Sequence, residues 1–266
     1  MTPTYFTLIT GASSGIGKAL AIECAKRGMN LLLISLPCKE LDTLVEHIRD
    51  NFNVTCNGFG IDLSQHCSST AVFKWVKENN YRVNVLINNV GVGSKGAFEN
   101  LPLDFYVSQI HLNITTTSSL TRLFMEDLKQ NAPSYILNTG SMGGFFAMPH
   151  KSVYAASKAY VYTFSRSLAL ELKDYNINVS VLCPGGTDSN ANTTAINADL
   201  KGLAKKSILQ PEEVAFVAID QMLKKKERII PGTINRLGYS ISCIVPEFVK
   251  SYFIRRAFKH VGKHNY

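Results

Sequence analysis

Short apolar runs alternate with amphipathic segments along most of the chain, and this alternation predicts the fold. Strands are predicted at Tyr5 to Thr10, Asn30 to Ser35, Val54 to Ile61, Val83 to Ile87, Ser134 to Asn138, Ile177 to Leu182 and Arg228 to Ile230. The second run is apolar throughout, as is typical of a strand buried on both faces of a parallel sheet. Helical periodicity fills the intervening segments, so the pattern predicts a doubly wound α/β fold with a mainly parallel, seven-stranded sheet flanked by helices.

The predicted helical segments are 18–27, 41–52, 67–80, 102–130, 151–175 and 211–226. Gly28 follows the first of them as a C′ glycine, and Pro211 opens the last at the first helical position. Asn113 lies inside the longest segment, where its helix propensity is unfavourable. Two alternatives account for it: a solvent-facing position, or an inward polar group that binds a water molecule or opens the helix locally.

Length and composition indicate one large α/β domain, residues 1–266, with a substantial core. The formal net charge of +8 lies in the last quarter, since residues 1–200 hold 15 basic and 15 acidic side chains and residues 201–266 hold 13 and 5. The six cysteines form no CxxC pair and no two histidines have metal-ligand spacing, so we expect reduced thiols in a cytoplasmic protein and no metal site. We also expect no secretory signal and no membrane-spanning segment, because no apolar run reaches the roughly 18–20 residues that a spanning helix needs.

A glycine-rich stretch, TGASSGIG at 10–17, joins the first predicted strand to the first helix. Such glycines bring backbone N–H groups and a helix N-terminus close to a phosphate, although a tight turn alone also needs them. The end of the second strand selects between dinucleotides, because an NAD site usually places a carboxylate there. Ser35 and Leu36 occupy this position and Lys39 is the first strong charge, which favours NADP(H) and leaves NAD(H) open. Lys39 is equally well explained as a solvated residue at the start of the next helix.

Polar residues follow several other strands, at the edge where open α/β sheets bind ligands. Asp62 comes directly after the third strand, either as a cap for the next element or as an acceptor for an adenine amine. A turn rich in Asn and Gly, 88–93, follows the fourth strand, and Ser141 lies just past the fifth. The sixth strand ends in the turn 183–187. We therefore expect these groups to meet at one edge of the sheet.

Tyr154 and Lys158 lie one helical turn apart, so their side chains share a helix face. A nearby ammonium favours the phenolate form of a tyrosine, whose reference pKa is about 10. A tyrosine held beside a lysine can therefore exchange a proton with an alcohol or a ketone near neutral pH. Because such pairs are also common on solvated helix faces, the assignment depends on the residues that converge on them.

Across nearly its whole length the chain resembles the short-chain dehydrogenase/reductase family, which implies a single Rossmann-type domain. The matching motifs, in the family's order, are TGASSGIG at 10–17, Asp62, Asn-Asn-Val-Gly at 88–91, Asn113, Ser141, Tyr154 with Lys158, and Pro184-Gly185. Ser141 precedes Tyr154 by thirteen residues, the spacing that the family uses. Each motif alone is weak, whereas the ordered set is specific.

The resemblance implies a role for each of these residues. Tyr154 would be the general acid/base on the substrate oxygen, and Lys158 would lower its pKa and hold the nicotinamide ribose. Ser141 would hydrogen-bond the same substrate oxygen, and Asn113 would hold a water molecule that links Lys158 to solvent. Besides Tyr154 and Lys158, the residues that would contact the dinucleotide are Gly11, Ser13, Ser14, Gly15, Ile16, Gly17, Asp62, Leu63, Asn89, Gly91, Pro184, Gly185 and Thr187. Many NADP-dependent members carry Arg near position 14 or at position 36, where this chain has Ser14 and Leu36.

Two segments after the sixth strand, 188–210 and 246–263, are candidates for contact with the substrate or with a membrane. Residues 188–210 lack a strong period and are predicted to form a loop with a short helix, which is a candidate lid over the substrate cleft. Residues 246–263 place apolar side chains at helical spacing and Lys and Arg mostly on other faces, which predicts a basic amphipathic helix. This helix either packs on protein with its basic face in water, or lies on an anionic membrane surface or guides an apolar substrate.

The sequence as a whole predicts an NAD(P)(H)-dependent oxidoreductase that interconverts a ketone and a secondary alcohol, reductively if NADP(H) is its cofactor. Apolar residues such as Phe98, Phe145, Phe146 and Met148 fall in segments expected to line the pocket, which favours an apolar or neutral small-molecule substrate. By resemblance, the two long helices would form the interface of a homodimer or homotetramer. The alternative is a nucleotide-binding regulatory or scaffold protein without turnover, and the complete catalytic set argues against it. The basic surplus lacks a stacking module, which argues against nucleic-acid binding.

Overall fold

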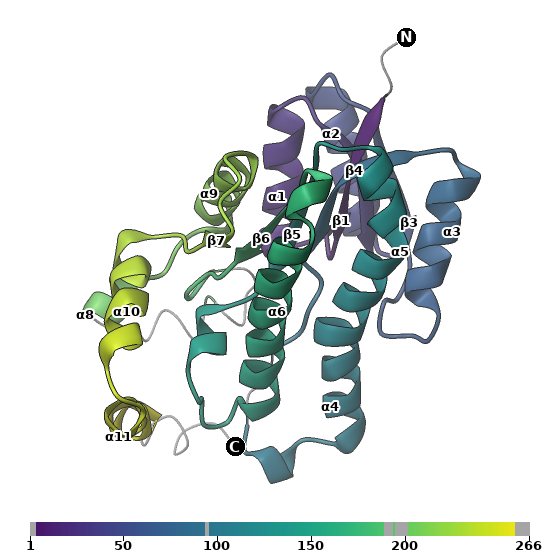
Figure 1. Ribbon diagram of the computed structural model, residues 1–266. Helices are drawn as coiled ribbons and strands as arrows, with labels where there is room; N and C mark the ends of the chain where they lie inside the picture. The colour runs from purple at the N-terminus through teal and green to yellow at the C-terminus, as the bar shows by residue number, and fades with distance from the viewer. Residues whose placement is uncertain (1–3, 94–95, 189–193, 195–201, 259–266) are drawn as a thin grey trace.

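Seven parallel strands form one sheet at the centre of the protein (Figure 1). The computed structural model describes residues 4–93, 96–188, 194 and 202–258. The strands are β1 (Tyr5–Thr10), β2 (Asn30–Ser35), β3 (Cys56–Gly60), β4 (Arg82–Asn88), β5 (Ser134–Thr139), β6 (Ile177–Leu182) and β7 (Arg228–Ile229). Their order across the sheet is β3-β2-β1-β4-β5-β6-β7, so the chain moves outward from β1 in one direction and then, through β4, in the other. This reversal confirms the predicted doubly wound arrangement.

Helices cover both faces of the sheet (Figure 1). They are α1 (Gly15–Lys26), α2 (Lys39–Asn51), α3 (Ser68–Glu78), α4 (Leu103–Ile110), α5 (Thr116–Gln130), α6 (Ser152–Glu171), α8 (Gly202–Lys206), α9 (Pro211–Leu223), α10 (Thr233–Ile244) and α11 (Glu247–Phe258), with shorter turns η1 (Phe98–Asn100), η2 (His111–Thr115), η3 (Met142–Phe145) and η4 (Lys173–Tyr175). One core cluster joins the sheet to α1, α2 and α9, and the other joins it to α3, α5 and α6.

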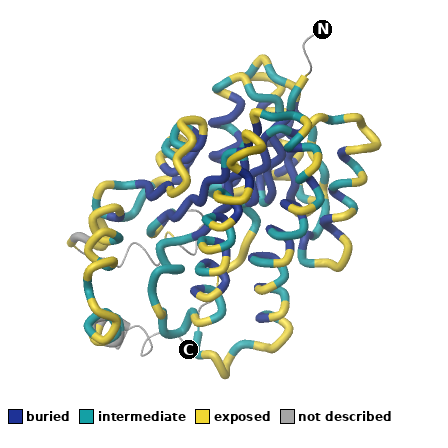
Figure 2. The backbone as a smooth tube through the Cα atoms, in the orientation of Figure 1, coloured by how far each residue is buried: buried dark blue, intermediate teal, exposed yellow. Residues whose placement is uncertain are grey.

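Strand β2 is buried on both faces of the sheet, which explains why its sequence is apolar throughout. Leu31 and Leu33 point into the core on the α1 side, and Leu32 and Ile34 point into the core on the α5 side. All four side chains are fully buried, because alternate residues of a central strand serve opposite faces. Figure 2 shows the same concentration of buried residues along the strands and exposed residues on the outer helices.

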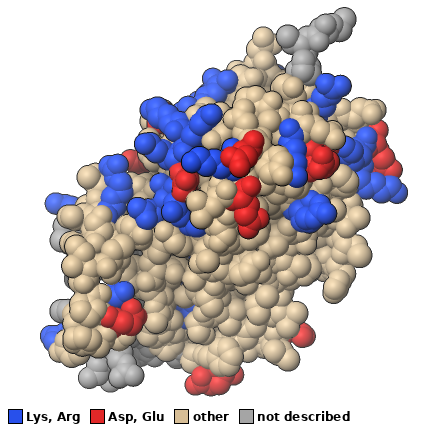
Figure 3. Space-filling view, viewed as in Figure 1, with Lys and Arg blue, Asp and Glu red and all other residues tan. Residues whose placement is uncertain are grey.

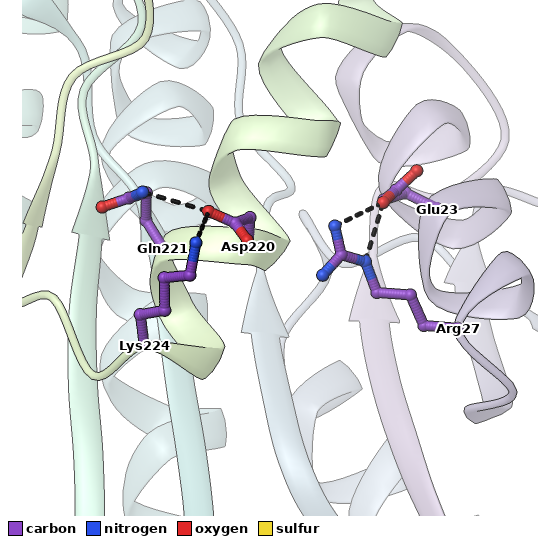
Figure 4. A network of polar contacts seen from close by, with 5 residues as sticks. All are labelled: Glu23, Arg27, Asp220, Gln221 and Lys224. Atoms are coloured by element: carbon purple, nitrogen blue, oxygen red, sulfur yellow. Dashed lines mark hydrogen bonds and ion pairs between the residues drawn. The ribbon is translucent and has the colours of Figure 1, made fainter.

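Helices α1 and α9 pack side by side and carry polar contacts along their outer edge (Figure 4). The Arg27 guanidinium donates to a Glu23 carboxylate oxygen at 2.7 Å and lies 5.5 Å from the centroid of the Phe216 ring. On α9, Lys224 Nζ donates to Asp220 Oδ2 at 2.9 Å. The Lys224–Asp220 pair is partly exposed, and a surface pair of this kind stabilises a fold by less than about 1 kcal/mol, whereas the Arg27–Glu23 pair is largely buried. Apolar residues of α1 and α9 belong to one core cluster.

The helix predicted over 102–130 is interrupted at its centre. Helix α4 ends at Ile110, a π-helical turn η2 spans His111–Thr115, and α5 begins at Thr116. Asn113 lies in this turn and is fully buried, so the solvent-facing alternative is wrong and the inward polar alternative is confirmed. A π turn adds a residue to the helical repeat, and such turns occur mostly at functional sites.

Other boundaries differ from the predictions by a few residues. Strand β3 begins at Cys56 and not at Val54, because the Thr55 N–H donates to the Asn30 side chain at 2.8 Å. Helix α6 ends at Glu171, and the predicted continuation to Tyr175 is the separate turn η4. Gly28 has a φ of +75°, which confirms its expected place after the first helix.

The C-terminal predictions are only partly covered. Most of the candidate lid, 189–193 and 195–201, lies outside the described residues, and α8 forms in its second half. The predicted helix over 246–263 is present as α11 to Phe258, and 259–263 lie outside the described residues. In the part of the chain that is described, every helix is too short or too polar to span a bilayer.

Candidate active site

The glycine-rich turn after β1 is shaped by two close approaches. Gly11 has a φ of +65°, a conformation that other residues adopt only with strain. A Cβ at Gly17 would lie 1.9 Å from the Gly11 carbonyl oxygen, so helix α1 starts here only if this position has no side chain. Ser14 precedes α1 without a capping hydrogen bond from its side chain, which leaves first-turn N–H groups for an anion. The turn therefore fits a dinucleotide pyrophosphate.

Asn89, at the end of β4, ties three strand ends together. Its Nδ2 donates to the Thr10 and Gly11 carbonyls at 3.1 and 3.3 Å, and its Oδ1 accepts from Thr139 Oγ1 at 3.3 Å. The backbone N–H groups of Asn89 and Val90 donate to Thr10 Oγ1 at 3.0 and 3.1 Å. The sequence indicated a cofactor contact for Asn89 and missed this second use of its side chain, because partners 79 residues away leave no local pattern.

Asn113 connects the π turn to the two neighbouring segments. Its Nδ2 donates to Ser157 Oγ at 2.9 Å and to the Val92 carbonyl at 3.1 Å, and its Oδ1 accepts from the Val92 N–H at 2.9 Å. Ser157 Oγ in turn donates to the Tyr154 carbonyl at 2.7 Å. A Cβ at Gly91 would lie 2.8 Å from Asn113 Oδ1 and 3.3 Å from Lys158 Nζ, so both side chains close on this glycine. Ser157 was not among the residues that the sequence singled out.

Ser141, Tyr154 and Lys158 lie together past the end of β5. The Ser141 side chain accepts from the Gly143 N–H at 3.0 Å, and a Cβ at Gly143 would lie 3.4 Å from Ser141 Oγ and 3.5 Å from the Tyr154 ring, so the two side chains are close neighbours. Lys158 Nζ donates to the Thr139 carbonyl at 2.7 Å and lies 5.9 Å from the centroid of the Tyr154 ring. The structure thus brings all four catalytic candidates to one edge of the sheet.

Burial dominates the electrostatics of this cluster. It raises the pKa of Tyr154, and the hydrogen bond from Ser141 opposes the rise. It also lowers the pKa of Lys158 to about 8, and the neighbouring Cys183 opposes that change. The sequence-based expectation of a lowered Tyr154 pKa is therefore not met in this structure, because desolvation of the phenolate was left out of the argument.

The turn after β6 is held between the catalytic segment and α10. The Met142 N–H donates to the Pro184 carbonyl at 2.9 Å, and Thr187 pairs with Leu209 in a short parallel bridge. A Cβ at Gly185 would lie 2.7 Å from the side chain of Asn235, which donates to the Pro231 and Ser207 carbonyls at 3.0 and 3.1 Å. Asn235 thus fixes the turn beside the catalytic cluster, a role that the sequence did not indicate.

Asp62 and Leu63, which were expected to contact the adenine, take part in local contacts in this structure. Asp62 accepts from the Ser64 N–H at 2.9 Å, which lowers the pKa of its carboxyl; this bond lies in the loop before α3, whose N-cap is Cys67, so Asp62 does not cap that helix. Leu63 is buried in the core, and its carbonyl accepts from Ser68 and Thr116. Whether these two residues also contact an adenine stays a prediction.

A hollow of about 460 Å³ lies beside the end of β2, and Lys39, Asp42 and Gly60 are among the residues that line it. Lys39 is the first residue of α2. Ser35 Oγ donates to Ser13 Oγ at 2.6 Å, which joins the end of β2 to the glycine-rich turn. Within the described ranges no three His, Cys, Asp or Glu side chains are grouped as a metal site requires.

An apolar pocket of about 920 Å³ lies beside helix α6, where Ala155, Ala156 and Ala159 line it next to the turns that carry Tyr154 and Lys158. Phe146, Met148 and Ala156 contribute to its lining, and Phe248 of α11 lies across from them. The Met148 sulfur would lie 3.0 Å from a Cβ at Gly143, a position 3.4 Å from Ser141 Oγ and 3.5 Å from the Tyr154 ring. Met148 therefore stands at the junction between the cavity and the catalytic groups.

The fold and this edge of the sheet define a dinucleotide-binding oxidoreductase. The family model of short chain dehydrogenases matches residues 6–200 of the chain. The chain belongs to this family, and it spans less than two thirds of the length of several curated relatives that it matches.

Three relatives illustrate the similarity. A very-long-chain 3-oxoacyl-CoA reductase of Vanderwaltozyma polyspora is 30% identical over 229 residues, 80% of this chain and 61% of that protein. The 17-beta-hydroxysteroid dehydrogenase type 3 of Mus musculus is 32% identical over 244 residues, 87% of this chain and 76% of that protein. A short-chain dehydrogenase from Sphingobium yanoikuyae, solved in complex with NADPH, is 28% identical with a TM-score of 0.80, covering 89% of this chain and 91% of that one.

Proposed function

We propose that the protein reduces a ketone on a large apolar molecule to a secondary alcohol, with NADP(H) preferred over NAD(H). The observation that carries this proposal is the close placement of Ser141, Tyr154 and Lys158, with Met148 between this cluster and an apolar pocket. A hydroxyl pair of this kind can hold one carbonyl oxygen and deliver a proton to it.

Each residue of the cluster has a step to perform. Tyr154 gives its proton to the substrate oxygen as negative charge develops there, and Ser141 donates a hydrogen bond to the same oxygen. The high pKa of Tyr154 keeps the phenol protonated at neutral pH, as a proton donor requires. Lys158, a turn away on α6, stabilises the phenolate that remains, and Asn113 holds α6 to the π turn through Ser157. When bound, the nicotinamide supplies the hydride.

The dinucleotide would be held along the edge of the sheet. The turn 11–17 would take the pyrophosphate, Asn89 and Gly91 would line the adenosine half, and Asp62 and Leu63 would contact the adenine. Tyr154 and Lys158 would contact the nicotinamide ribose, and the turn at 184–187 would meet the carboxamide through Thr187. This assignment is supported by the absence of room for side chains at Gly17 and Gly91.

The preference for NADP(H) rests on the end of β2. No carboxylate follows Ser35 before Lys39, which is among the residues that line the hollow beside this strand end, as is Asp42. A ribose 2′-phosphate would gain from this charge and from the N-terminus of α2. The NADPH-bound relative supports the same choice.

The substrate class is supported by the cavity and by the relatives. Its volume of about 920 Å³ and its phenylalanine, methionine and alanine lining suit a bulky apolar group and not a small acid. Very-long-chain 3-oxoacyl-CoA and 17-hydroxysteroids, in the names of two relatives, both present a ketone or secondary alcohol on a large apolar body. We therefore select 3-oxoacyl thioesters of increasing length and oxosteroids as test substrates.

We further propose a homodimer through α4 and α6. Leu103, Val107 and Ile110 of α4 are exposed, and so is Tyr160 of α6. Figure 3 shows few charged side chains on the lower part of the molecule, where Figure 1 places α4 and one end of α6. Sedimentation equilibrium of the purified protein tests this, and a monomer that persists at high concentration would contradict it.

The experiment that tests the reaction compares Tyr154→Phe with the matched variant Tyr160→Phe, on the same helix. Loss of the phenol at 154 removes the proton donor, so we expect kcat with NADPH to fall by about 10²–10⁴. NADPH affinity should change little, because one hydroxyl among many contacts is lost. Tyr160 is exposed and its loss should leave kcat unchanged. Equal rates for wild type and Tyr154→Phe would overturn the proposed mechanism.

A further inference from the structure

Helices α10 and α11 lie at one end of the molecule, outside the layers that cover the sheet (Figure 1). One side of α10 packs on the catalytic half of the protein: the ring of Tyr239 lies 4.6 Å from that of Phe145, and Asn235 is buried against Gly185. The other side faces solvent, and Figure 2 shows most of α10 as exposed. The inner side already anchors the helix, so the outer side is available for another contact.

The outer side of α10 is strongly apolar. Leu237, Ile241 and Ile244 recur at helical spacing and are 62%, 52% and 84% exposed. Phe248, at the start of α11, is also exposed, at 77%. We call these four residues the apolar row. Single exposed apolar residues are common on soluble proteins, whereas several exposed apolar residues on one side of a helix indicate an interaction surface.

Basic residues accompany the apolar row. Residues 228–266 contain seven Lys and Arg and a single acid, Glu247, whose carboxylate is paired with Lys250 at 2.8 Å. Arg236 is exposed next to Leu237 in the sequence, and Arg256 is exposed on α11. No acidic residue occurs between 228 and 246, so Glu247 is the one carboxylate that the residues of α10 and α11 contribute.

We propose that the apolar row docks on an anionic phospholipid surface, with α10 and the start of α11 lying in the plane of the interface. Apolar side chains on one side and surrounding cations are what an interfacial helix needs, because the former enter the acyl boundary and the latter meet lipid phosphates. The same charge disfavours a second copy of the chain as the occupant, since two surfaces with this basic surplus repel each other.

The docking has a consequence for substrate access. Phe248 belongs to the apolar row and also lines the cavity beside Met148. The docked protein would therefore hold its apolar cavity next to the lipid in which an apolar substrate dissolves. This consequence rests on the proposed function, whereas the docking itself does not.

Co-sedimentation with vesicles tests the proposal. The full chain is mixed with vesicles of phosphatidylcholine alone and with vesicles that also contain phosphatidylglycerol. We expect binding to the anionic vesicles, weakened by salt, and much weaker binding to the neutral ones. Failure of the wild-type protein to bind anionic vesicles at low salt would overturn the proposal.

Two variants distinguish vesicle binding through the apolar row from non-specific adsorption. Ile244→Ser should lower the partition coefficient by roughly tenfold, because one inserted isoleucine is lost. Leu170→Ser is the matched control, since Leu170 of α6 is 72% exposed and lies outside the apolar row, and it should bind as wild type does. Both positions are exposed, so thermal unfolding should confirm that both variants fold.

Equal binding by wild type and Ile244→Ser, or an equal loss with Leu170→Ser, would also overturn the proposal. The oligomeric state of Ile244→Ser by light scattering tests the competing occupant. A wild-type dimer that dissociates in this variant would assign the apolar row to a second copy of the chain and not to lipid.

Discussion

Lys158 is buried, with 5% of its surface exposed, and we expect its removal to stabilise the fold while it removes activity. The perturbation is Lys158→Met, which keeps an unbranched side chain of similar length and removes the charge. Burial lowers the pKa of Lys158 from 10.5 to about 8. One pKa unit corresponds to 1.36 kcal/mol, so burying the ammonium lowers the free energy of unfolding by about 3 kcal/mol at pH 7.

The substitution also removes a favourable contact. The hydrogen bond to the Thr139 carbonyl, 2.7 Å long, is lost, and a buried acceptor without a partner costs about 1 kcal/mol. The net expectation is a gain of about 2 kcal/mol at pH 7, or roughly 4–8 °C in the melting temperature of a chain of this size.

The stability gained in Lys158→Met should depend on pH. Between pH 8 and 10.5 the unfolded lysine is protonated and the folded one is not, so wild-type stability rises with pH in this window. Below pH 8 both states are protonated and the penalty is fully present. The advantage of Lys158→Met should therefore be largest below pH 8 and shrink as the pH approaches 10.

Urea unfolding of the cofactor-free protein at pH 7 and pH 9.5 measures this difference. Lys74→Met is the control, because the Lys74 side chain is 73% exposed and its charge costs nothing on folding. The variant at 158 should be more stable than wild type at pH 7, and the difference should narrow at pH 9.5. A destabilised Lys158→Met at pH 7, or a difference that does not change with pH, would refute the reasoning.

Three further substitutions test the cofactor and catalytic geometry. Gly17→Ala places a Cβ against the Gly11 carbonyl, so urea unfolding should show a free energy of unfolding that is lower by about 3 kcal/mol, and titration should show weaker NADPH binding. Gly238→Ala is the control, because a Cβ there meets open space and neither quantity should change. Lys39→Ala should weaken NADPH binding about fivefold and leave NADH binding unchanged, and equal effects on both would contradict the 2′-phosphate assignment. Asn113→Ala removes the buried hydrogen bond to Ser157 Oγ, so we expect the free energy of unfolding to fall by about 1–3 kcal/mol and kcat to fall as well, and an unchanged kcat would exclude a catalytic link.

Local pattern predicted the sheet well because each strand carries its own signal. The run at Leu31–Ile34 is typical of a strand buried on both faces, and the doubly wound arrangement follows from seven predicted strands joined by helices. The positions of Ser141, Tyr154 and Lys158 were also predictable, since strand ends and one helix face fix where their side chains meet.

What the sequence could not predict depends on partners far along the chain. The π turn at Asn113 forms around contacts with Val92 and Ser157, and Asn235 fits against Gly185 fifty residues earlier. The pKa of Tyr154 was expected to fall beside Lys158, yet its direction is set by burial, which depends on the whole fold.

The central claim is that a hydride from the nicotinamide and a proton from Tyr154 convert a ketone to a secondary alcohol. The most direct measurement is mass spectrometry of the alcohol formed in ordinary water from NADPH that carries deuterium at its hydride-donating position. The test uses whichever oxosteroid or 3-oxoacyl thioester the enzyme reduces fastest. We expect one deuterium on the carbinol carbon and a rate of reduction that falls sharply in Tyr154→Phe. An alcohol without deuterium, or a rate that does not depend on Tyr154, would contradict it.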